Sequence, residues 1–265
     1  MRRHLVDTGE GALHFMSEGD LGSRRTVLFF HQSPSSSRMW AGVMAELGRR
    51  GVGSIAGDMF DYGMSDRSAT QLDLHSHAGL LVDAASKIVG GDLIAVGHHT
   101  GAIFAASAAS QRDLHGLLIM GYPLYTSWRE KYERLGSRIH PDRYGSDGAE
   151  LAELWVELNA SIEPDTPYGA RHEILVDRLS AGPIWYTAYA ALLQTDIQAV
   201  LESAVSTGVP VTAVFAHDDA VSRFEPGVAA VTGAESIWID GGPWVTIEHP
   251  DRVADVVEQF IESVP

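Results

Sequence analysis

Short apolar runs rich in β-branched residues alternate with longer amphipathic segments along most of the chain. The apolar runs have the length of buried strands and cover residues 26–32, 52–58, 92–97, 116–121, 209–216 and 236–240. Helical periodicity covers residues 39–50, 72–89, 102–110, 224–231 and 251–262. This alternation predicts an α/β fold, with a mostly parallel sheet buried by helices on both faces. Residues 12–17 predict a further strand, in a hairpin at an edge of the sheet.

The alternation stops between residues 124 and 195, where no strand pattern stands out. Helical periodicity continues over residues 150–161 and 172–179. The prolines of this stretch divide it into short helices, and they are Pro141, Pro164, Pro167 and Pro183. We therefore expect a core domain formed by residues 1–123 and 196–265, with residues 124–195 inserted as a helical cap over the sheet.

The charge balance narrows the classes of partner. The 265 residues include 35 acidic and 19 basic ones, a formal net charge of −16. Nucleic acids and anionic membranes require clustered Lys and Arg, so we expect neither as a partner. No apolar run reaches the ~18 residues of a membrane span, and the first residues lack the apolar core of a signal peptide. We expect a cytoplasmic protein with a small-molecule substrate; a homodimer is left open.

One segment carries a recognisable catalytic geometry. Residues 92–106 (DLIAVGHHTGAIFAA) give an apolar strand, a turn between Gly97 and Gly101, and a helix of small residues. This is the strand–turn–helix context of the G-x-S-x-G nucleophile elbow, which holds its central side chain above the sheet. The two glycines allow strand and helix to approach closely, and the central residue, His99, can then take a strained backbone conformation.

Four further motifs follow in a consistent order. They are residues 31–34 (HQSP) with Trp40, 58–66 (DMFDYGMSD), 216–219 (AHDD) and 242–250 (GPWVTIEHP). Together with the elbow, these motifs resemble those of the α/β-hydrolase superfamily over the whole chain, in its capped branch of haloalkane dehalogenases and epoxide hydrolases. The resemblance implies an α/β-hydrolase fold, an oxyanion loop at residues 31–34 and a catalytic acid at Asp219.

The departures from that family decide the chemistry. His99 stands where the family has a nucleophilic Ser, Asp or Cys, and Pro243 stands where it has the catalytic His. An acyl-enzyme needs an oxygen or sulfur nucleophile beside a base. The sequence supplies neither at the matched positions, and a chain without cysteine offers no thiolate. A standard Ser-His-Asp esterase is therefore excluded.

His99 predicts acid–base chemistry instead. A helix N-terminus disfavours the charged ring, whereas Asp219 would favour it. A neutral imidazole accepts a proton and can later return it. The resemblance further implies an oxyanion hole from the backbone N–H groups of Ser33 and Thr100, which depends on no particular side chain. We expect proton transfer on a small, largely apolar carbonyl substrate, with hydrolysis, lyase, isomerase and cyclase chemistry all open.

The rest of the site is expected between cap and sheet. Its pocket residues are predicted to be His31, Gln32, Tyr122, Trp128, Trp185, Pro243 and Trp244. His98 is expected to pack against the oxyanion loop, and Asp58 is a second candidate acid. We expect no cofactor, because neither a dinucleotide fingerprint nor a P-loop is present. We expect no metal either, because neighbouring histidines such as His98 and His99 rarely point at one ion.

Two other functions remain open at this stage. The first is a catalytically silent binding protein that keeps the pocket of the α/β-hydrolase fold. The second is an ester hydrolase with a displaced nucleophile in residues 33–37 (SPSSS), or with His249 as a displaced base. Loss of turnover on replacement of His99, with ligand affinity retained, separates the acid–base enzyme from both.

Overall fold

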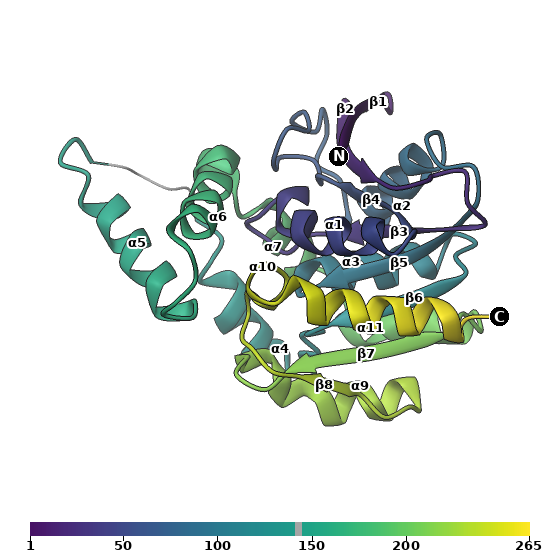
Figure 1. Ribbon diagram of the computed structural model, residues 1–265. Coiled ribbons are helices and arrows are strands. Elements are labelled where there is room, and N and C mark those ends of the chain that lie inside the picture. Colours follow the sequence, from purple (N-terminus) through teal and green to yellow (C-terminus); the bar gives the residue numbers. More distant parts are fainter. Residues whose placement is uncertain (141–144) are drawn as a thin grey trace.

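The computed structural model describes residues 1–140 and 145–265, which form an eight-stranded sheet with helices on both faces (Figure 1). The strands are β1 (Arg2–Asp7), β2 (Ala12–Glu18), β3 (Arg25–Phe30), β4 (Gly53–Gly57), β5 (Asp92–His98), β6 (Gly116–Met120), β7 (Val211–Ala216) and β8 (Ile237–Ile239). Their order is β1-β2-β4-β3-β5-β6-β7-β8. From β4 to β8 the neighbouring strands are parallel, as the apolar runs predicted.

The N-terminal edge differs from the prediction. Residues 12–17 lie in β2, but this strand pairs with β1 on one side and with β4 on the other, antiparallel to both. The edge strand is β1, whose alternate positions are exposed. Its sequence, RRHLVD, is too polar to give an apolar run, and pairing with β2 stabilises it instead.

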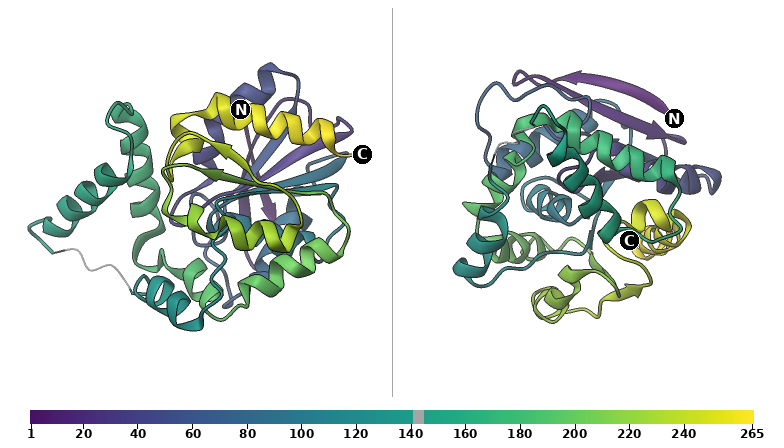
Figure 2. Two further views of the ribbon diagram at one scale, coloured as in Figure 1. Left: turned by 90° about the horizontal axis from the view of Figure 1, so that it is seen from below. Right: turned by 90° about the vertical axis from the view of Figure 1, so that its left-hand side faces the viewer.

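Helices cover both faces of the sheet (Figure 2). Helices α1 (Ala41–Arg49) and α11 (Pro250–Ser263) pack on one face, and α2 (Leu74–Ala85), α3 (Thr100–Ala109), α8 (Ile197–Ser206) and α9 (Glu225–Thr232) pack on the other. Alternating side chains of β3 serve the two layers: Leu28 and Phe30 face α2 and α3, while Val27 and Phe29 face α1 and α11. Burial on both faces explains why the strand is apolar throughout.

Residues between β6 and α8 form helices, and no strand occurs among those that the structure describes. They are α4 (Trp128–Lys131), a π-helical turn η2 (Tyr132–Gly136), α5 (Ala149–Ser161), α6 (Tyr168–Ala181), a 3₁₀ turn η3 (Gly182–Ile184) and α7 (Thr187–Leu193). Figure 1 shows α5 and α6 projecting to one side of the sheet. Residues 124–195 are called the insertion below. Pro141 lies outside the described residues.

The remaining short elements surround the carboxyl edge of the sheet. They are the 3₁₀ turns η1 (Ser37–Trp40) and η4 (Ala220–Phe224) and the single helical turn α10 (Val245–Glu248). Among the described helices, none combines the length and the apolar character that crossing a membrane requires.

Candidate active site

His99 occupies a strained turn between β5 and α3. Its backbone angles are φ 49° and ψ −115°, in a region that side chains other than glycine rarely enter. The turn is held by a close approach of two backbones: a Cβ atom on Gly101 would lie 2.3 Å from the carbonyl oxygen of Phe30. Only glycine fits there, so α3 can begin directly against β3 and the His99 ring stands above the carboxyl edge.

The ring of His99 contacts Asp219 directly. Its Nε2 lies 2.5 Å from Oδ2 of Asp219, the residue that follows the turn after β7. Space for the ring comes from Gly121 at the end of β6, where a Cβ atom would lie 2.7 Å from Cδ2 of His99. The other carboxylate oxygen accepts the N–H of Val221 at 3.1 Å. His99 at the elbow and the acid Asp219 therefore interact directly, with no side chain between them.

The carboxylate fixes the tautomer of the ring. Burial opposes ionisation of Asp219, but the charge and hydrogen bond of His99 outweigh it and hold the pKa at about 2. An ionised carboxylate only accepts hydrogen bonds, so Nε2 carries the hydrogen and the neutral ring keeps its lone pair on Nδ1. No other described residue forms a hydrogen bond with Nδ1. Since 18% of the side chain is exposed, this nitrogen suits a proton acceptor.

His98 packs behind the pair. Its ring stacks on His99 with centroids 4.1 Å apart and planes at 25°, and it meets Trp40 edge-on. Burial, with the neighbouring His99, lowers the pKa of His98 well below its usual value, so this ring stays neutral. It therefore serves as a packing surface for His99.

The same residues form the one cluster, within the described part of the chain, that could in principle hold a metal ion. The ligand atoms of His98, His99 and Asp219 lie within 4.8 Å of one another. Imidazole lone pairs lie in the ring plane, however, and two nearly parallel stacked rings do not direct them to one point. The cluster as found fits a hydrogen-bonded pair better than an ion, and the expectation of no metal remains a prediction.

A cavity of about 570 Å³ opens over the His99 ring. The core contributes Gln32, Ser33, His99, Thr100, Asp219, Pro243 and Trp244 to its wall. The insertion contributes Arg138, Leu158, Ile174, Arg178, Trp185 and Tyr189, among others. Four of the seven predicted pocket residues are thus at the cavity: Gln32, Trp185, Pro243 and Trp244. Trp244 lies beside Pro243 and donates its indole N–H to Ser161.

Three predicted pocket residues lie elsewhere, and the prediction is corrected for them. Tyr122 is fully buried, and its hydroxyl donates to the carbonyl of Ile197. Trp128 is 66% exposed and stacks on Tyr132. His31 is fully buried: Nδ1 donates to the carbonyl of Gln32, and Nε2 accepts the N–H of Met59. Residue type alone did not show on which side of its element each ring lies.

Ser33 and Thr100 are adjacent, but their hydrogen bonding differs from the expectation. The N–H of Ser33 does not point freely into the cavity; it donates to Oγ1 of Thr100 at 2.7 Å. The carbonyl of Ser33 accepts a hydrogen bond from the hydroxyl of Tyr189, so both backbone polar groups of Ser33 are held. The Thr100 N–H belongs to the first turn of α3, whose N–H groups have no partner within the helix. The donors that remain available at the cavity wall are therefore the N–H and the hydroxyl hydrogen of Thr100.

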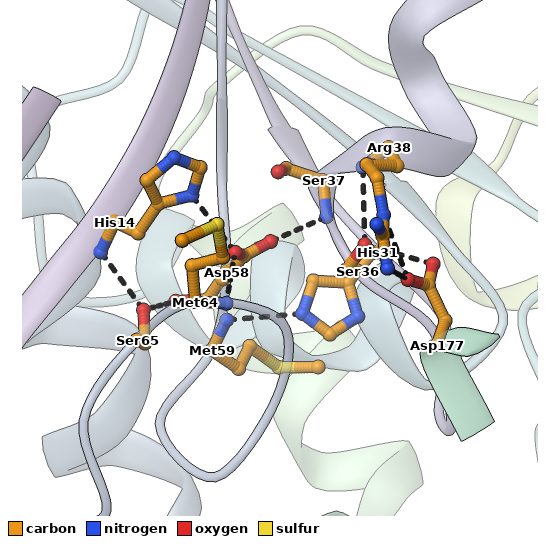
Figure 3. Close-up of polar contacts among 10 residues, drawn as sticks. All are labelled: His14, His31, Ser36, Ser37, Arg38, Asp58, Met59, Met64, Ser65 and Asp177. Atoms are coloured by element: carbon orange, nitrogen blue, oxygen red, sulfur yellow. Dashed lines mark hydrogen bonds and ion pairs between the residues drawn. The ribbon is translucent and has the colours of Figure 1, made fainter. Parts of the chain in front are cut away.

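Asp58 is a structural residue rather than a second acid (Figure 3). Its carboxylate accepts the N–H groups of Ser37 at 2.6 Å and Met64 at 2.8 Å, and it pairs with Nδ1 of His14 at 2.9 Å. Burial opposes its ionisation, but the hydrogen bond to His14 and the other contacts lower its pKa. His249 is also engaged elsewhere, because its Nε2 lies 2.8 Å from Oε1 of Glu163 in the insertion.

Three features of the site escaped sequence reasoning. Arg138 and Arg178 were not among the expected site residues, because a cationic side chain gives no apolar periodicity. Gly121 follows a strand and looked like any strand-terminating glycine. The side chain of Thr100 was passed over in favour of its N–H. A pattern read along one segment does not show which segments meet in space.

Solved structures that superpose on the whole chain settle the fold. A thermophilic esterase from Thermogutta terrifontis, in its malate-bound form, has a TM-score of 0.77 at 19% identity and covers 99% of this chain and 98% of its own. E-2-(acetamidomethylene)succinate hydrolase has a TM-score of 0.76 at 20% identity and covers 99% of both chains. This chain has the α/β-hydrolase fold.

A third structure, an epoxide hydrolase, superposes equally well. Epoxide hydrolase A from Mycobacterium thermoresistibile has a TM-score of 0.76 at 16% identity and covers 100% of this chain and 99% of its own. No protein-family model and no curated protein matches the sequence. The α/β-hydrolase fold predicted from the five motifs is confirmed, and at these identities the likeness extends to the fold alone.

Proposed function

We propose that this chain is an enzyme in which His99 acts as general acid and base on a carbonyl substrate, with no covalent enzyme intermediate. The observation that carries the proposal is the 2.5 Å contact between Nε2 of His99 and Asp219 at the wall of the cavity. A scaffold that only binds ligands has no need of an ionised acid held against an imidazole in a strained turn. Such strain is typical of functional sites.

In the proposed reaction Nδ1 of His99 removes a proton, either from the carbon next to the carbonyl group or from water. The ring then carries a positive charge, which the Asp219 carboxylate stabilises. Negative charge that develops on the carbonyl oxygen meets the N–H and hydroxyl of Thr100 at the start of α3. Nδ1 returns the proton in a later step. Hydrolysis, elimination, C–C cleavage, isomerisation and cyclisation all begin with such a transfer.

The contacts of the cavity serines do not support an ester hydrolase with a displaced nucleophile. Ser33 and Ser161 line the cavity, and neither hydroxyl is hydrogen-bonded to an imidazole. Ser35 and Ser36 donate to Asp177, away from His99. A serine without an adjacent base is a weak nucleophile. The solved structures of the same fold carry the names of hydrolases, which makes hydrolysis the first reaction class to test.

Hydrogen exchange tests the proposal without knowledge of the natural product. Propiophenone and 3-benzoylpropionate, incubated in D₂O with the protein, should lose the NMR signal of the protons next to the carbonyl faster than in buffer. His99→Asn should remove about 100-fold or more of this acceleration, the usual contribution of a general base. Asparagine tolerates positive φ better than most residues, so it is the matched replacement at this turn. Hydrolysis of p-nitrophenyl esters is followed in parallel.

The outcomes separate the candidate functions. Exchange or hydrolysis that survives in His99→Asn would contradict the proposal and favour a displaced nucleophile. A native protein that accelerates neither reaction but binds these ketones would be the catalytically silent binding protein. We further propose that the insertion is a cap over the site and that no cofactor or metal takes part. The cytoplasmic location and a homodimer remain predictions.

A further inference from the structure

Two arginines of the insertion flank an aromatic pair in the cavity wall. The guanidinium carbon of Arg178 lies 3.5 Å from the ring centroid of Trp185, and that of Arg138 lies 5.6 Å from the ring centroid of Tyr189. The two rings meet edge-on with centroids 5.8 Å apart. All four side chains line the same cavity as His99. Two positive charges are thus concentrated around one aromatic corner of the site.

This aromatic corner is joined to the acid–base pair by hydrogen bonds. The hydroxyl of Tyr189 donates to the carbonyl of Ser33, and the N–H of Ser33 donates to Oγ1 of Thr100. Thr100 follows His99 in the chain. A ligand group held by the arginines therefore lies in the same cavity as the reacting carbonyl. Both charges also reach Tyr189: burial raises the pKa of its hydroxyl to about 12, and Arg138 and Arg178 act against that rise.

Arg138 has no acidic partner among the residues that the structure describes. Asp219 is engaged by His99. The other acidic residues of the wall, Glu157 and Asp218, are exposed, and neither forms an ion pair with Arg138. No carboxylate of the described residues lies within ion-pairing distance of Arg138. In a chain with net charge −16, an arginine so placed attracts an anionic ligand against the overall field.

We propose that the substrate carries a carboxylate, bound by Arg138 at the cavity wall, beside an apolar or aromatic body. This inference rests on the proposed function, since it names the class of substrate on which His99 acts. A guanidinium matches a carboxylate with two parallel hydrogen bonds, and stacking on an aromatic face fixes the plane of such a group. Trp185, Ile174 and Leu158 supply the apolar surface for the body. The expected substrate is an oxo acid, or an ester that also carries a free carboxylate, rather than a neutral ketone.

Calorimetric titration with a matched pair of ligands tests the carboxylate site. The pair is 3-benzoylpropionate and its primary amide, which differ by one charge and little in size. The native protein should bind the acid about tenfold more tightly than the amide. In Arg138→Gln this preference should fall to about threefold or less, and Arg138→Lys should restore part of it. Arg134→Gln is the matched control, because Arg134 is exposed like Arg138 and lies on the same segment, but it is outside the cavity wall.

Two results would overturn the assignment. One is equal affinity for acid and amide in the native protein, or no binding of the acid. The other is a preference that Arg138→Gln leaves unchanged. Titration of His99→Asn separates this proposal from the proposed function: a true carboxylate site keeps its preference when exchange is lost. Conversely, propiophenone has no carboxylate, so its exchange should need His99 but not Arg138. That result supports the acid–base proposal independently of the titration, which alone decides the carboxylate site.

Discussion

At the scale of single residues, the proposed catalytic group has two members, His99 and Asp219, where the resemblance implies three. The resemblance implies a nucleophile at the elbow, a histidine in the last turn and an acid after β7. Here the imidazole itself stands at the elbow and reaches Asp219 directly, and Gly121 leaves the space for it. A second histidine would have no position between them. This geometry explains why Pro243 can occupy the last turn without disconnecting the acid.

The pKa of Asp219 gives a pH-dependent stability. Its folded value of about 2 lies below the ordinary 3.8, so the carboxylate stabilises the fold above pH ~4. That contribution, roughly 2 kcal/mol, is lost as the pH falls toward 2. Asp219→Asn should therefore be less stable than the native protein at pH 6, and the difference should shrink below pH 4. Urea denaturation at several pH values measures it.

The same variant has a kinetic signature. The neutral amide in Asp219→Asn would no longer fix the hydrogen on Nε2 of His99, so exchange should fall by about 100-fold or more. A stability difference that is constant from pH 6 to pH 2 would contradict the assigned ionisation. Asp113→Asn is the control, because Asp113 is exposed and lies outside the cavity wall.

Thr100 offers a second prediction at this scale. Its hydroxyl already accepts the N–H of Ser33, so its own hydrogen is available to a developing oxyanion. Thr100→Val keeps the shape but removes both the donor and the acceptor of the Ser33 N–H, and exchange should fall by roughly 10- to 100-fold. Thr100→Ser should retain most of the activity. Undiminished exchange in Thr100→Val would show that the hydroxyl only supports the loop.

At the scale of elements, one contact ties the insertion to the loop after β3. Asp177 of α6 is buried and accepts hydrogen bonds from the hydroxyl of Ser36 and from Nε of Arg38, both at 2.8 Å (Figure 3). The hydroxyl of Ser35 also donates to Asp177. The loop that carries Ser33 and the helix that carries Arg178 are therefore held together. The contacts of Asp177 therefore help to fix the position of Arg178 relative to His99 and Asp219.

Replacement of Asp177 tests whether its contacts with Ser36 and Arg38 hold the insertion to the loop after β3. Asp177→Asn leaves Arg38 without its carboxylate, and we expect a loss of roughly 2 kcal/mol, since Arg38 is partly exposed and the cost is less than for a fully buried pair. Thermal denaturation should show a melting temperature lower by about 4–8 °C. Asp165→Asn, an exposed change in the same insertion, should have no effect. Equal stability of Asp177→Asn and Asp165→Asn would contradict this role of Asp177.

The elements also show what periodicity can predict. The insertion helix expected at 150–161 is α5 (Ala149–Ser161), and the one expected at 172–179 is the longer α6 (Tyr168–Ala181). Helix α8 (Ile197–Ser206) was missed, although Ile197, Val200, Leu201 and Ala204 form its buried face. It follows the insertion directly, and no Gly or Pro separates it from α7; Asp196, which accepts the N–H of Ala199, is the start signal that was overlooked.

At the scale of the molecule, the motifs were sufficient for the fold and for the position of His99. Strand order follows from βα connections, which have one hand, and the elbow is a local structure. The cavity wall was only half predicted, because Tyr122 and Trp128 turn away from it and Arg138 and Arg178 turn toward it. Those directions depend on how the insertion packs on the sheet, which no local pattern encodes.

Chemical rescue tests the central claim most directly. His99→Gly removes the imidazole and suits the positive φ of the turn, so the fold should persist with an empty space beside Asp219. Exchange of 3-benzoylpropionate protons in D₂O is then measured with and without added imidazole. We predict that the exchange rate falls by about 100-fold or more in the variant. Added imidazole should raise the variant's rate at least tenfold, and this increase should saturate with imidazole concentration. Exchange at the native rate without imidazole would contradict the account.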